Sequence, residues 1–333
     1  MAAAILITGA AGFIGSHLVG ALLQNNRRIV AVDNFDKFYP RFIKERNFHE
    51  ASHENLKNVT LIEGDIRDPS LYFKLKELGP YQMIIHLAAR AGVRPSLADP
   101  ALYADVNING SVRLLDFAQK ENIKRIIFAS SSSVYGNNIK VPFSESDPVD
   151  APISPYAATK RAGELLCHTF HHLYGINILC LRFFTVYGPR QRPDLAIHKF
   201  TQSIFNNEPI TLYGDGNSQR DYTYIDDILN GLIHSVHLLE NSNQPLFEIL
   251  NLGESRTVSL TELVQLIEKA LGKKAVLKWQ PEQPGDVKRT FADLTRARSI
   301  LKYDPKTPIE QGIPQFVEWF AKHQHQASPK ASL

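Results

Sequence analysis

A tyrosine and a lysine are the residues of this sequence best suited to proton transfer. Tyr156 and Lys160 stand four apart in "SPYAATKRAGE", where Ser154 and Pro155 predict the start of a helix, so the two side chains would share one helix face. A phenol has a pKa of about 10, too high for a base at neutral pH, but a nearby ammonium favours the phenolate and lowers that pKa. The spacing therefore predicts Tyr156 as a general base and Lys160 as the residue that tunes it.

Four consecutive serines form a second polar group. Ser130 to Ser133 follow the apolar run "IIFA", so they fit the end of a strand that turns into a loop, and they also fit the wall of a polar site. Serine hydroxyls donate and accept hydrogen bonds, but their pKa lies far above neutrality and they cannot serve as a general acid or base. The two interpretations do not exclude each other.

Three glycines in "TGAAGFIGSHL" stand between a predicted strand and a predicted helix. Gly9 permits a tight turn, Gly12 lets the backbone approach a pyrophosphate, and Gly15 lets the helix pack close to the sheet. Asp33, at the end of the next strand, can accept both hydroxyls of an adenosine ribose and would repel a 2′-phosphate. The pattern predicts bound NAD rather than NADP. It also gives weight to the tyrosine–lysine pair, which by itself is a common spacing.

Further strand ends would complete the cofactor site. "GDIRD" follows the third predicted strand, where adenine should lie, and "HLAA" ends the fourth with small side chains that let the backbone pass close to the cofactor. The predicted cofactor-binding residues are Gly9, Gly12, Phe13, Ile14, Gly15, Asp33, Asn34, Asp65, Ile66, Leu87, Ala88, Ala89, Tyr156 and Lys160.

Strands and helices must alternate to bring these residues together. Helices are predicted between apolar runs, for example in "GSHLVGALLQN", and the runs are continuously apolar, as is typical of a parallel sheet covered on both faces. The order predicts an α/β fold with a Rossmann-type doubly wound parallel sheet and right-handed crossovers. The predicted strands are residues 4–8, 28–33, 58–65, 82–88, 123–130, 176–184 and 247–253.

The second half of the chain has a looser pattern. "YGPRQRPD" predicts a turn-rich loop, and helices are predicted in "TVSLTELVQLIEKALGK", "TRARSILKY" and "PIEQGIPQFVEWFAKH". We predict a NAD-binding domain over residues 1–184 that also takes in 222–253, a smaller C-terminal α/β substrate domain over 185–221 and 254–325, and a polar, disordered tail over 326–333.

Composition excludes several classes of protein. Hydrophobic residues make up 44% and charged residues 21% of the chain, as in ordinary globular proteins. The net charge of +3 comes without a basic block, so nucleic acid is not an expected partner. No apolar run is long enough for a membrane span, and "MAAAILITGA" fits a first strand better than a signal. The only cysteines, Cys167 and Cys180, favour a reducing cytoplasm over a disulfide framework.

Together these motifs resemble one known family. The glycine pattern, Asp33, "HLAA", the serine run, "YAATK" and "RDYTYIDD" are similar to the extended short-chain dehydrogenase/reductase family over nearly the whole chain. Within it, "HLAARAGVRPS", "ASSSSVYG", "RFFTVYGPRQRPD" and "RDYTYIDDI" most resemble UDP-glucuronate 4-epimerases, a group of nucleotide-sugar 4-epimerases. The resemblance implies a UDP-sugar substrate and a tightly bound NAD that is regenerated in each turnover.

The resemblance also implies a mechanism. Tyr156 would take the proton of the sugar 4-hydroxyl while C4 gives hydride to NAD, the 4-keto sugar would rotate in the site, and the hydride would return to its other face. Ser131, four residues before the tyrosine of "VYG", would be the catalytic serine that hydrogen-bonds O4. Related 4,6-dehydratases carry an Asp–Glu pair where this chain has Ser132 and Ser133, and the glutamate of related decarboxylases is absent too. Dehydration is therefore disfavoured.

The substrate-binding residues follow from the same resemblance. A 4-keto glucuronate loses carbon dioxide readily. We therefore expect Ser132, Ser133 and Thr185 to bind the carboxylate as neutral donors that supply no acid. Arginines suit the anionic groups because a guanidinium can bind two oxygens, and an aspartate would contact the uridine ribose. The predicted substrate-binding residues are Arg94, Ser131, Ser132, Ser133, Thr185, Arg192, Arg220 and Asp286.

Other assignments stay open on the sequence alone. Thr185 replaces an asparagine common in UDP-hexose epimerases, but it separates glucuronate only weakly from UDP-glucose or a UDP-N-acetylhexosamine. A non-catalytic NAD sensor is a remote alternative, because it could dispense with the catalytic residues. "CHTFHH" (167–172) lacks an outside partner, so no metal site is predicted. In the resembled family the helix starting at Tyr156 usually packs across a dimer interface, so we expect a homodimer through it.

Overall fold

The computed structural model describes residues 3–282 and 287–323, and a parallel sheet forms its centre. Seven of the described strands pair in the order β10-β6-β5-β4-β1-β2-β3. Each falls on one of the predicted apolar runs, which confirms the predicted Rossmann-type α/β fold. The strands are β1 (Ala4–Thr8), β2 (Ile29–Asp33), β3 (Val59–Glu63), β4 (Tyr81–His86), β5 (Arg125–Ser131), β6 (Asn177–Phe183) and β10 (Phe247–Leu252).

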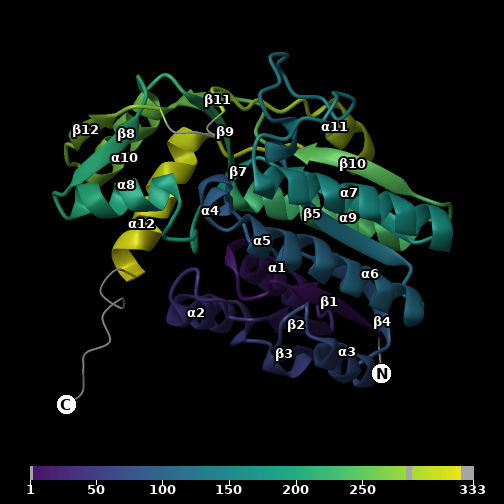
Figure 1. Ribbon diagram of the computed structural model, residues 1–333. Helices are drawn as coiled ribbons and strands as arrows, with labels where there is room; N and C mark the ends of the chain where they lie inside the picture. The colour runs from purple at the N-terminus through teal and green to yellow at the C-terminus, as the bar shows by residue number, and fades with distance from the viewer. Residues whose placement is uncertain (1–2, 283–286, 324–333) are drawn as a thin grey trace.

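Helices cover both faces of this sheet (Figure 1). Ile5 and Ile7 of β1 belong to one core and Leu6 to the other, because successive strand residues point to opposite faces. Burial is not continuous at the two edges of the sheet, since Leu61 of β3 is 40% exposed and the first half of β10 is only partly buried. One core is packed by α1 (Phe13–Gln24), α2 (Arg41–Ser52) and α9 (Ile225–Asn241), and the other by α3 (Pro69–Glu77), α6 (Gly110–Lys120) and α7 (Pro155–Tyr174).

The connections at the carboxyl ends of the strands are irregular. The order of strands reverses between β1 and β4, and parallel α/β sheets bind ligands in the crevice at such a point. The chain after β4 forms α4 (Val93–Ala98), α5 (Pro100–Ala104) and a π-helical segment (Asp105–Asn109), and the chain after β5 forms a 3₁₀ turn (Ser132–Tyr135).

A second, smaller group of elements lies to the left of the central sheet in Figure 1. It holds a sheet of β11-β9-β7 and a pair β12-β8. The strand β9 continues past the predicted boundary at residue 222 before α9 and β10 return to the central sheet. The elements are β7 (Thr185–Tyr187), α8 (Ala196–Phe205), β8 (Pro209–Tyr213), β9 (Gln219–Tyr224), β11 (Thr257–Ser259), α10 (Leu260–Leu271), β12 (Val276–Gln280) and α12 (Ile309–His323), while α11 (Thr295–Leu301) packs on β10.

The structure bears on the predicted membrane spans but not on the predicted disordered tail. The tail predicted to be disordered, 326–333, lies outside the described residues. In the part of the chain that is described, no helix combines the length and the apolar character needed to cross a membrane.

Candidate active site

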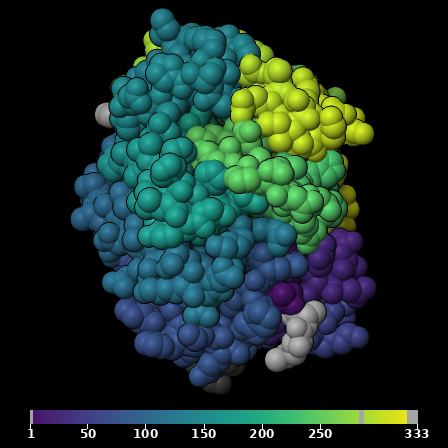
Figure 2. All heavy atoms as spheres, turned by 90° about the vertical axis from the view of Figure 1, so that its right-hand side faces the viewer, coloured from purple at the N-terminus to yellow at the C-terminus, as the bar shows by residue number. Residues whose placement is uncertain are grey.

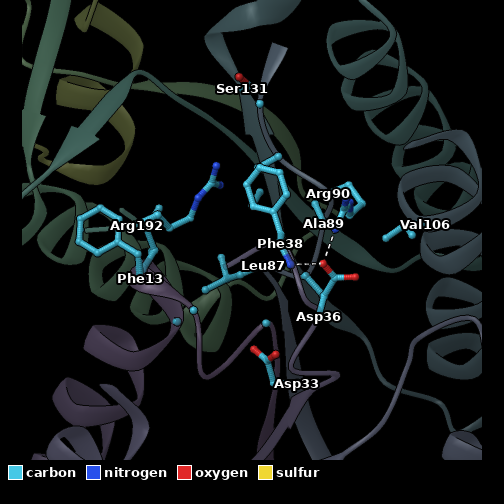
Figure 3. Close-up of a pocket in the computed structure, with 18 of the residues that line it drawn as sticks. Phe13, Asp33, Asp36, Phe38, Leu87, Ala89, Arg90, Val106, Ser131 and Arg192 are labelled. Atoms are coloured by element: carbon cyan, nitrogen blue, oxygen red, sulfur yellow. Dashed lines mark hydrogen bonds and ion pairs between the residues drawn. The ribbon is translucent and has the colours of Figure 1, made fainter. Parts of the chain in front are cut away.

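One pocket runs along the carboxyl ends of the central strands (Figure 3). All fourteen residues predicted to bind the cofactor line it, from the glycine loop after β1 to Tyr156 and Lys160 on α7. Ser131, Thr185 and Arg192 line it as well. The pocket therefore joins the residues predicted for cofactor binding to those predicted for catalysis.

The glycine loop packs too tightly for any side chain at two of its positions. Gly9 has a φ of +72°, and a Cβ there would lie 2.7 Å from the backbone nitrogen of Ala88. A Cβ at Gly15 would lie 2.1 Å from the Gly9 carbonyl oxygen. The helix α1 begins next to Gly12, which has an extended backbone and provides no side-chain cap. The first turn of α1 therefore faces the pocket with backbone groups and its positive dipole end, which suits a pyrophosphate.

Asp33 ends β2 at the wall of this pocket. Its Oδ2 accepts a hydrogen bond from the Ala11 N–H at 3.0 Å and its Oδ1 accepts one from the Phe35 N–H at 2.9 Å. Burial raises the pKa of Asp33, while these backbone donors lower it. A carboxylate has about four acceptor positions, so Asp33 keeps capacity for ribose hydroxyls.

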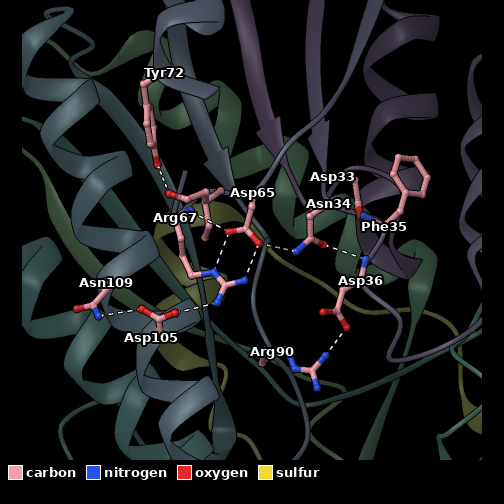
Figure 4. A network of polar contacts seen from close by, with 11 residues as sticks. Asp33, Asn34, Phe35, Asp36, Asp65, Arg67, Tyr72, Arg90, Asp105 and Asn109 are labelled. Atoms are coloured by element: carbon pink, nitrogen blue, oxygen red, sulfur yellow. Dashed lines mark hydrogen bonds and ion pairs between the residues drawn. The ribbon is translucent and has the colours of Figure 1, made fainter. Parts of the chain in front are cut away.

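A polar network borders the same end of the pocket (Figure 4). The Arg67 guanidinium donates to both oxygens of Asp65 at 2.9 and 2.8 Å and to Asp105 at 2.8 Å. The Asn34 amide also donates to Asp65, at 3.0 Å. Mainly through the Arg67 hydrogen bonds, the pKa of Asp65 falls to about 2. Asp65 is thus a fixed carboxylate beside the adenine end predicted from the sequence.

Tyr156 and Lys160 lie in the first turns of α7, as the spacing predicts. The Ser154 hydroxyl accepts a hydrogen bond from the Ala157 N–H at 3.1 Å and caps the helix. The Lys160 ammonium donates to the Ala129 carbonyl of β5 at 2.7 Å, which ties the helix to the strand that carries the serines. Burial lowers the pKa of Lys160 to about 8, so this ammonium loses its proton far more readily than an exposed lysine.

The protonation of Tyr156 depends on several neighbours. Burial raises the pKa of Tyr156, whereas a hydrogen bond with Ser131 and the positive charge of Arg192 lower it. Lys160 lies 6.0 Å from the centre of the phenol ring and is not among the groups that shift its pKa here. The role of Lys160 in tuning Tyr156 stays a prediction, and the positive charge of Arg192 also lowers the pKa of the phenol.

Two of the four serines line the pocket, and the other two are not among its described lining residues. Ser131 ends β5 and faces the pocket (Figure 3), and Ser130 also lines it while donating to Glu164 at 2.6 Å. Ser132 and Ser133 open the 3₁₀ turn, and they are not among the described residues that form the pocket wall. The Ser133 N–H donates to the Ser131 hydroxyl at 3.1 Å, so this residue supports Ser131 instead.

The predicted substrate residues are only partly brought together. Thr185 and Arg192 line the pocket, but Arg94 and Arg220 are not among its described lining residues. The Arg94 guanidinium lies 4.6 Å from the ring centre of Tyr213, and Arg220 donates to the Gln219 carbonyl. The predicted uridine contact, Asp286, lies outside the described residues.

Several pocket residues were not predicted from the sequence. Asp36, Phe38 and Arg90 line the pocket, and Arg90 forms an ion pair with Asp36. Asn107 fixes the backbone of Arg90, since its amide accepts from the Arg90 N–H at 2.8 Å and donates to the Arg90 carbonyl at 3.0 Å. The available signal was position: Arg90 directly follows "HLAA", and Asp36 stands three residues after Asp33.

Two histidines of "CHTFHH" pack against an aromatic ring of β10. Within residues 3–282 and 287–323, no group of three or more His, Cys, Asp or Glu side chains could hold a metal ion. His168 and His171 instead pack on Phe247, with ring centres 5.1 and 5.6 Å apart.

A Rossmann-type sheet with this glycine loop, a buried acid after the second strand and a tyrosine–lysine pair defines the extended class of short-chain dehydrogenases and reductases. The chain belongs to the NAD dependent epimerase/dehydratase family, whose model matches residues 5–253.

Three similar proteins illustrate the relationship. A UDP-glucuronate 4-epimerase of Thermodesulfobacterium geofontis is 40% identical over 316 residues, which cover 94% of this chain and 95% of the relative. The crystal structure of a UDP-glucuronic acid 4-epimerase from Bacillus cereus with UDP-glucuronic acid and NAD has a TM-score of 0.87 at 36% identity, covering 96% of this chain and 99% of that chain. A UDP-glucose 4-epimerase of Thermotoga maritima with UDP-glucose has a TM-score of 0.85 at 32% identity, with the same coverage.

Proposed function

We propose that this chain is an NAD-dependent UDP-glucuronate 4-epimerase that forms UDP-galacturonate through a 4-keto intermediate. The single observation that carries the proposal is the meeting of Tyr156, Ser131 and Lys160 in the pocket whose other wall is the glycine loop and Asp33. The nearly full-length similarity to UDP-glucuronate 4-epimerases supports the choice of sugar.

The pocket residues fit a bound NAD. Asp33 would accept the ribose hydroxyls, the first turn of α1 would hold the pyrophosphate, and Lys160 would hold the nicotinamide ribose. Bound NAD would supply a hydride acceptor that later returns the hydride to C4. Tyr156 would remove the proton of the 4-hydroxyl and return it, and Ser131 would hydrogen-bond O4 while its own contact with Tyr156 favours the phenolate.

The sugar end of the pocket offers an anionic substrate a neutral hydroxyl and an arginine, which is paired with Asp194. Thr185 offers a neutral hydroxyl, and Arg192 brings a buried positive charge whose field reaches Tyr156. An arginine cannot give up its proton in this pH range, so it would bind a carboxylate without protonating C5 of the keto sugar. We assign Ser132 and Ser133 a supporting place behind Ser131.

The proposal includes the roles of the two domains and a homodimer. Residues 1–184 with 222–253 would bind NAD, and 185–221 with 254–325 would bind the UDP-sugar. We propose a homodimer through α7, because Leu165 and Leu173 are 53% and 61% exposed on it. Figure 2 shows teal atoms, the colour of α7, on the face of the molecule that is turned toward the viewer. The two free, buried cysteines support a cytoplasmic enzyme.

A UDP-glucose or UDP-N-acetylhexosamine 4-epimerase is the second candidate, favoured by the similarity to the Thermotoga maritima structure. Purified protein would be incubated with a panel of UDP-sugars, and C4 epimers and carbon dioxide would be measured. We expect inversion of UDP-glucuronate with little decarboxylation, and Tyr156→Phe should abolish it while NAD stays bound. Preference for UDP-glucose, dominant carbon dioxide release, or full activity of Tyr156→Phe would contradict the proposal.

A further inference from the structure

Three loops that are distant in the sequence meet beside the cofactor pocket through one phenyl ring. The Arg90 guanidinium lies 4.9 Å from the centre of the Phe38 ring, and the Arg192 guanidinium lies 5.1 Å from the same centre. In Figure 3 the ring lies between the two arginines. Both distances are within the range of cation–π attraction. The loop after β2 thus joins the loop after β4 to the loop after β7.

Ion pairs neutralise both arginines at this junction. Arg90 pairs with Asp36, and Arg192 pairs with Asp194 through two nitrogens at 2.9 and 2.6 Å. Without these carboxylates, two guanidinium groups on one ring would repel each other. The Arg90 and Arg192 side chains are only 18% and 17% exposed, so solvent screens the contacts weakly.

The backbones on both sides of the junction are held in place. The Lys44 ammonium donates to the Asp36 carbonyl at 2.6 Å. The Asp36 N–H donates to the Asn34 amide oxygen at 3.0 Å, as Figure 4 shows. On the other side, Asn107 fixes the Arg90 backbone. Among the described residues, no backbone hydrogen bond joins the two held segments, so side-chain contacts form the junction.

We propose that Asp36, Phe38 and Arg90 form a clasp that keeps the nicotinamide cofactor on the protein between the two hydride transfers. All three residues line the pocket in which the glycine loop, Asp33 and Lys160 would hold NAD, and they connect its cofactor wall to the loop that carries Arg192. Opening the clasp separates these walls. The inference rests on the proposed epimerisation, in which the reduced cofactor must stay until the keto sugar has turned.

A clasp predicts a particular kinetic pattern. A side chain that merely touches NAD slows its departure, whereas a closure around the pocket slows both arrival and departure. Purified holoenzyme would be mixed with excess isotope-labelled NAD, and the exchange rate would give the dissociation rate constant. Dividing this constant by the dissociation constant from equilibrium dialysis gives the association rate constant.

The clasp variants are Phe38→Ala and Asp36→Asn, with Lys37→Ala as the matched control on an exposed residue of the same loop. We expect both rate constants to rise about tenfold in Phe38→Ala and in Asp36→Asn, given the usual strength of cation–π and ion-pair contacts, and to keep their parental values in Lys37→Ala. Phe38→Leu keeps apolar bulk but lacks the ring. If Phe38→Ala folds poorly, Phe38→Leu replaces it, and we expect the same rise in both rate constants.

Parental exchange rates in the clasp variants, or a rise of the dissociation rate constant alone, would overturn the clasp. The exchange experiment contains no sugar. A protein that exchanges NAD as expected but epimerises no UDP-sugar would therefore refute the proposed function and leave the clasp intact, and an active epimerase with unaltered exchange would do the reverse.

Discussion

Two arginine–carboxylate pairs of the same geometry lie on opposite sides of the active site and differ in burial. Arg182 donates to both oxygens of Glu164 at 2.8 and 2.9 Å, and Arg67 donates to both oxygens of Asp65 at 2.9 and 2.8 Å. The side chains of the first pair are 1% and 0% exposed, and those of the second are 33% and 25% exposed. The two pairs therefore have the same hydrogen-bond geometry, but water reaches the second pair and not the first.

The buried pair holds the catalytic elements together. Glu164 belongs to α7, Arg182 to β6, and the Ser130 hydroxyl of β5 donates to Glu164 at 2.6 Å. The Arg182 guanidinium also lies 4.8 Å from the ring centre of Tyr135. The partly exposed pair, by contrast, links the chain after β3 to the π-helical segment, because Arg67 also donates to Asp105. The comparison teaches that the cost of breaking a pair depends on whether water can replace the lost partner.

The largest expected effect comes from breaking the buried pair. Glu164→Ala leaves the Arg182 charge without its carboxylate in a site that water does not reach. We expect the free energy of unfolding to fall by about 3–5 kcal/mol, measured by urea denaturation. Glu164→Ala combined with Arg182→Met removes both charges and should recover part of this loss. A single variant within about 1 kcal/mol of the parent would break the comparison.

A second test examines packing beside the buried pair. Gly163 precedes Glu164, and a Cβ there would lie 2.3 Å from the Phe128 ring. Gly163→Ala should cost about 1–3 kcal/mol of unfolding free energy, because α7 must move away from β5, and it should lower epimerase activity as the catalytic helix shifts. Gly20→Ala in α1 is the matched control, since its Cβ would make contacts of 3.4 Å or more with Ala51 of α2. Equal losses in the two variants would contradict this account.

The smallest expected effect comes from the exposed pair. Arg67→Ala should lower the free energy of unfolding by about 1 kcal/mol or less, because water solvates the Asp65 carboxylate that remains. High salt should shrink the difference between parent and variant. Urea denaturation at low and high ionic strength would measure both values. A loss as large as that of Glu164→Ala would show that exposure does not separate the pairs.

The same variant makes a prediction about pH. The pKa of Asp65 is lowered to about 2 in the folded protein, first of all by the Arg67 hydrogen bonds, whereas an unfolded aspartate titrates at about 3.9. A lowered pKa stabilises the fold above the unfolded value, and this stabilisation is lost as the pH falls through the folded value. The difference between parent and Arg67→Ala should therefore be constant near neutrality and shrink below about pH 4. A stability difference that grows towards acid pH would contradict this prediction.

Local rules made much of the site predictable. Gly15 is required by close contacts within one strand–turn–helix unit, Gly9 by contacts with the backbone after the adjacent strand β4, and Asp33 ends the very next strand. Tyr156 and Lys160 are placed by a capped helix whose start is written in the sequence. In each case the deciding neighbours lie within a few residues or in an adjacent strand.

Contacts between distant segments were out of reach of the same reasoning. Arg90 and Asp36 are 54 residues apart, and no local pattern marks them as partners. From the serine run, Ser131, Ser132 and Ser133 were predicted to bind the substrate. The strand ends at Ser131, and Ser132 and Ser133 in the following 3₁₀ turn are not among the described residues that line the pocket, so their contact with a substrate stays a prediction.

The sequence by itself determined the parallel sheet, the glycine loop, the acid at the end of the second strand and the tyrosine–lysine helix, because backbone sterics, capping and apolar periodicity act over short distances. Only the tertiary structure decided which serines line the pocket, that Arg192 lies close enough to lower the pKa of Tyr156, and which loops meet through Phe38. These outcomes depend on charge and packing between segments that meet only after the sheet has formed.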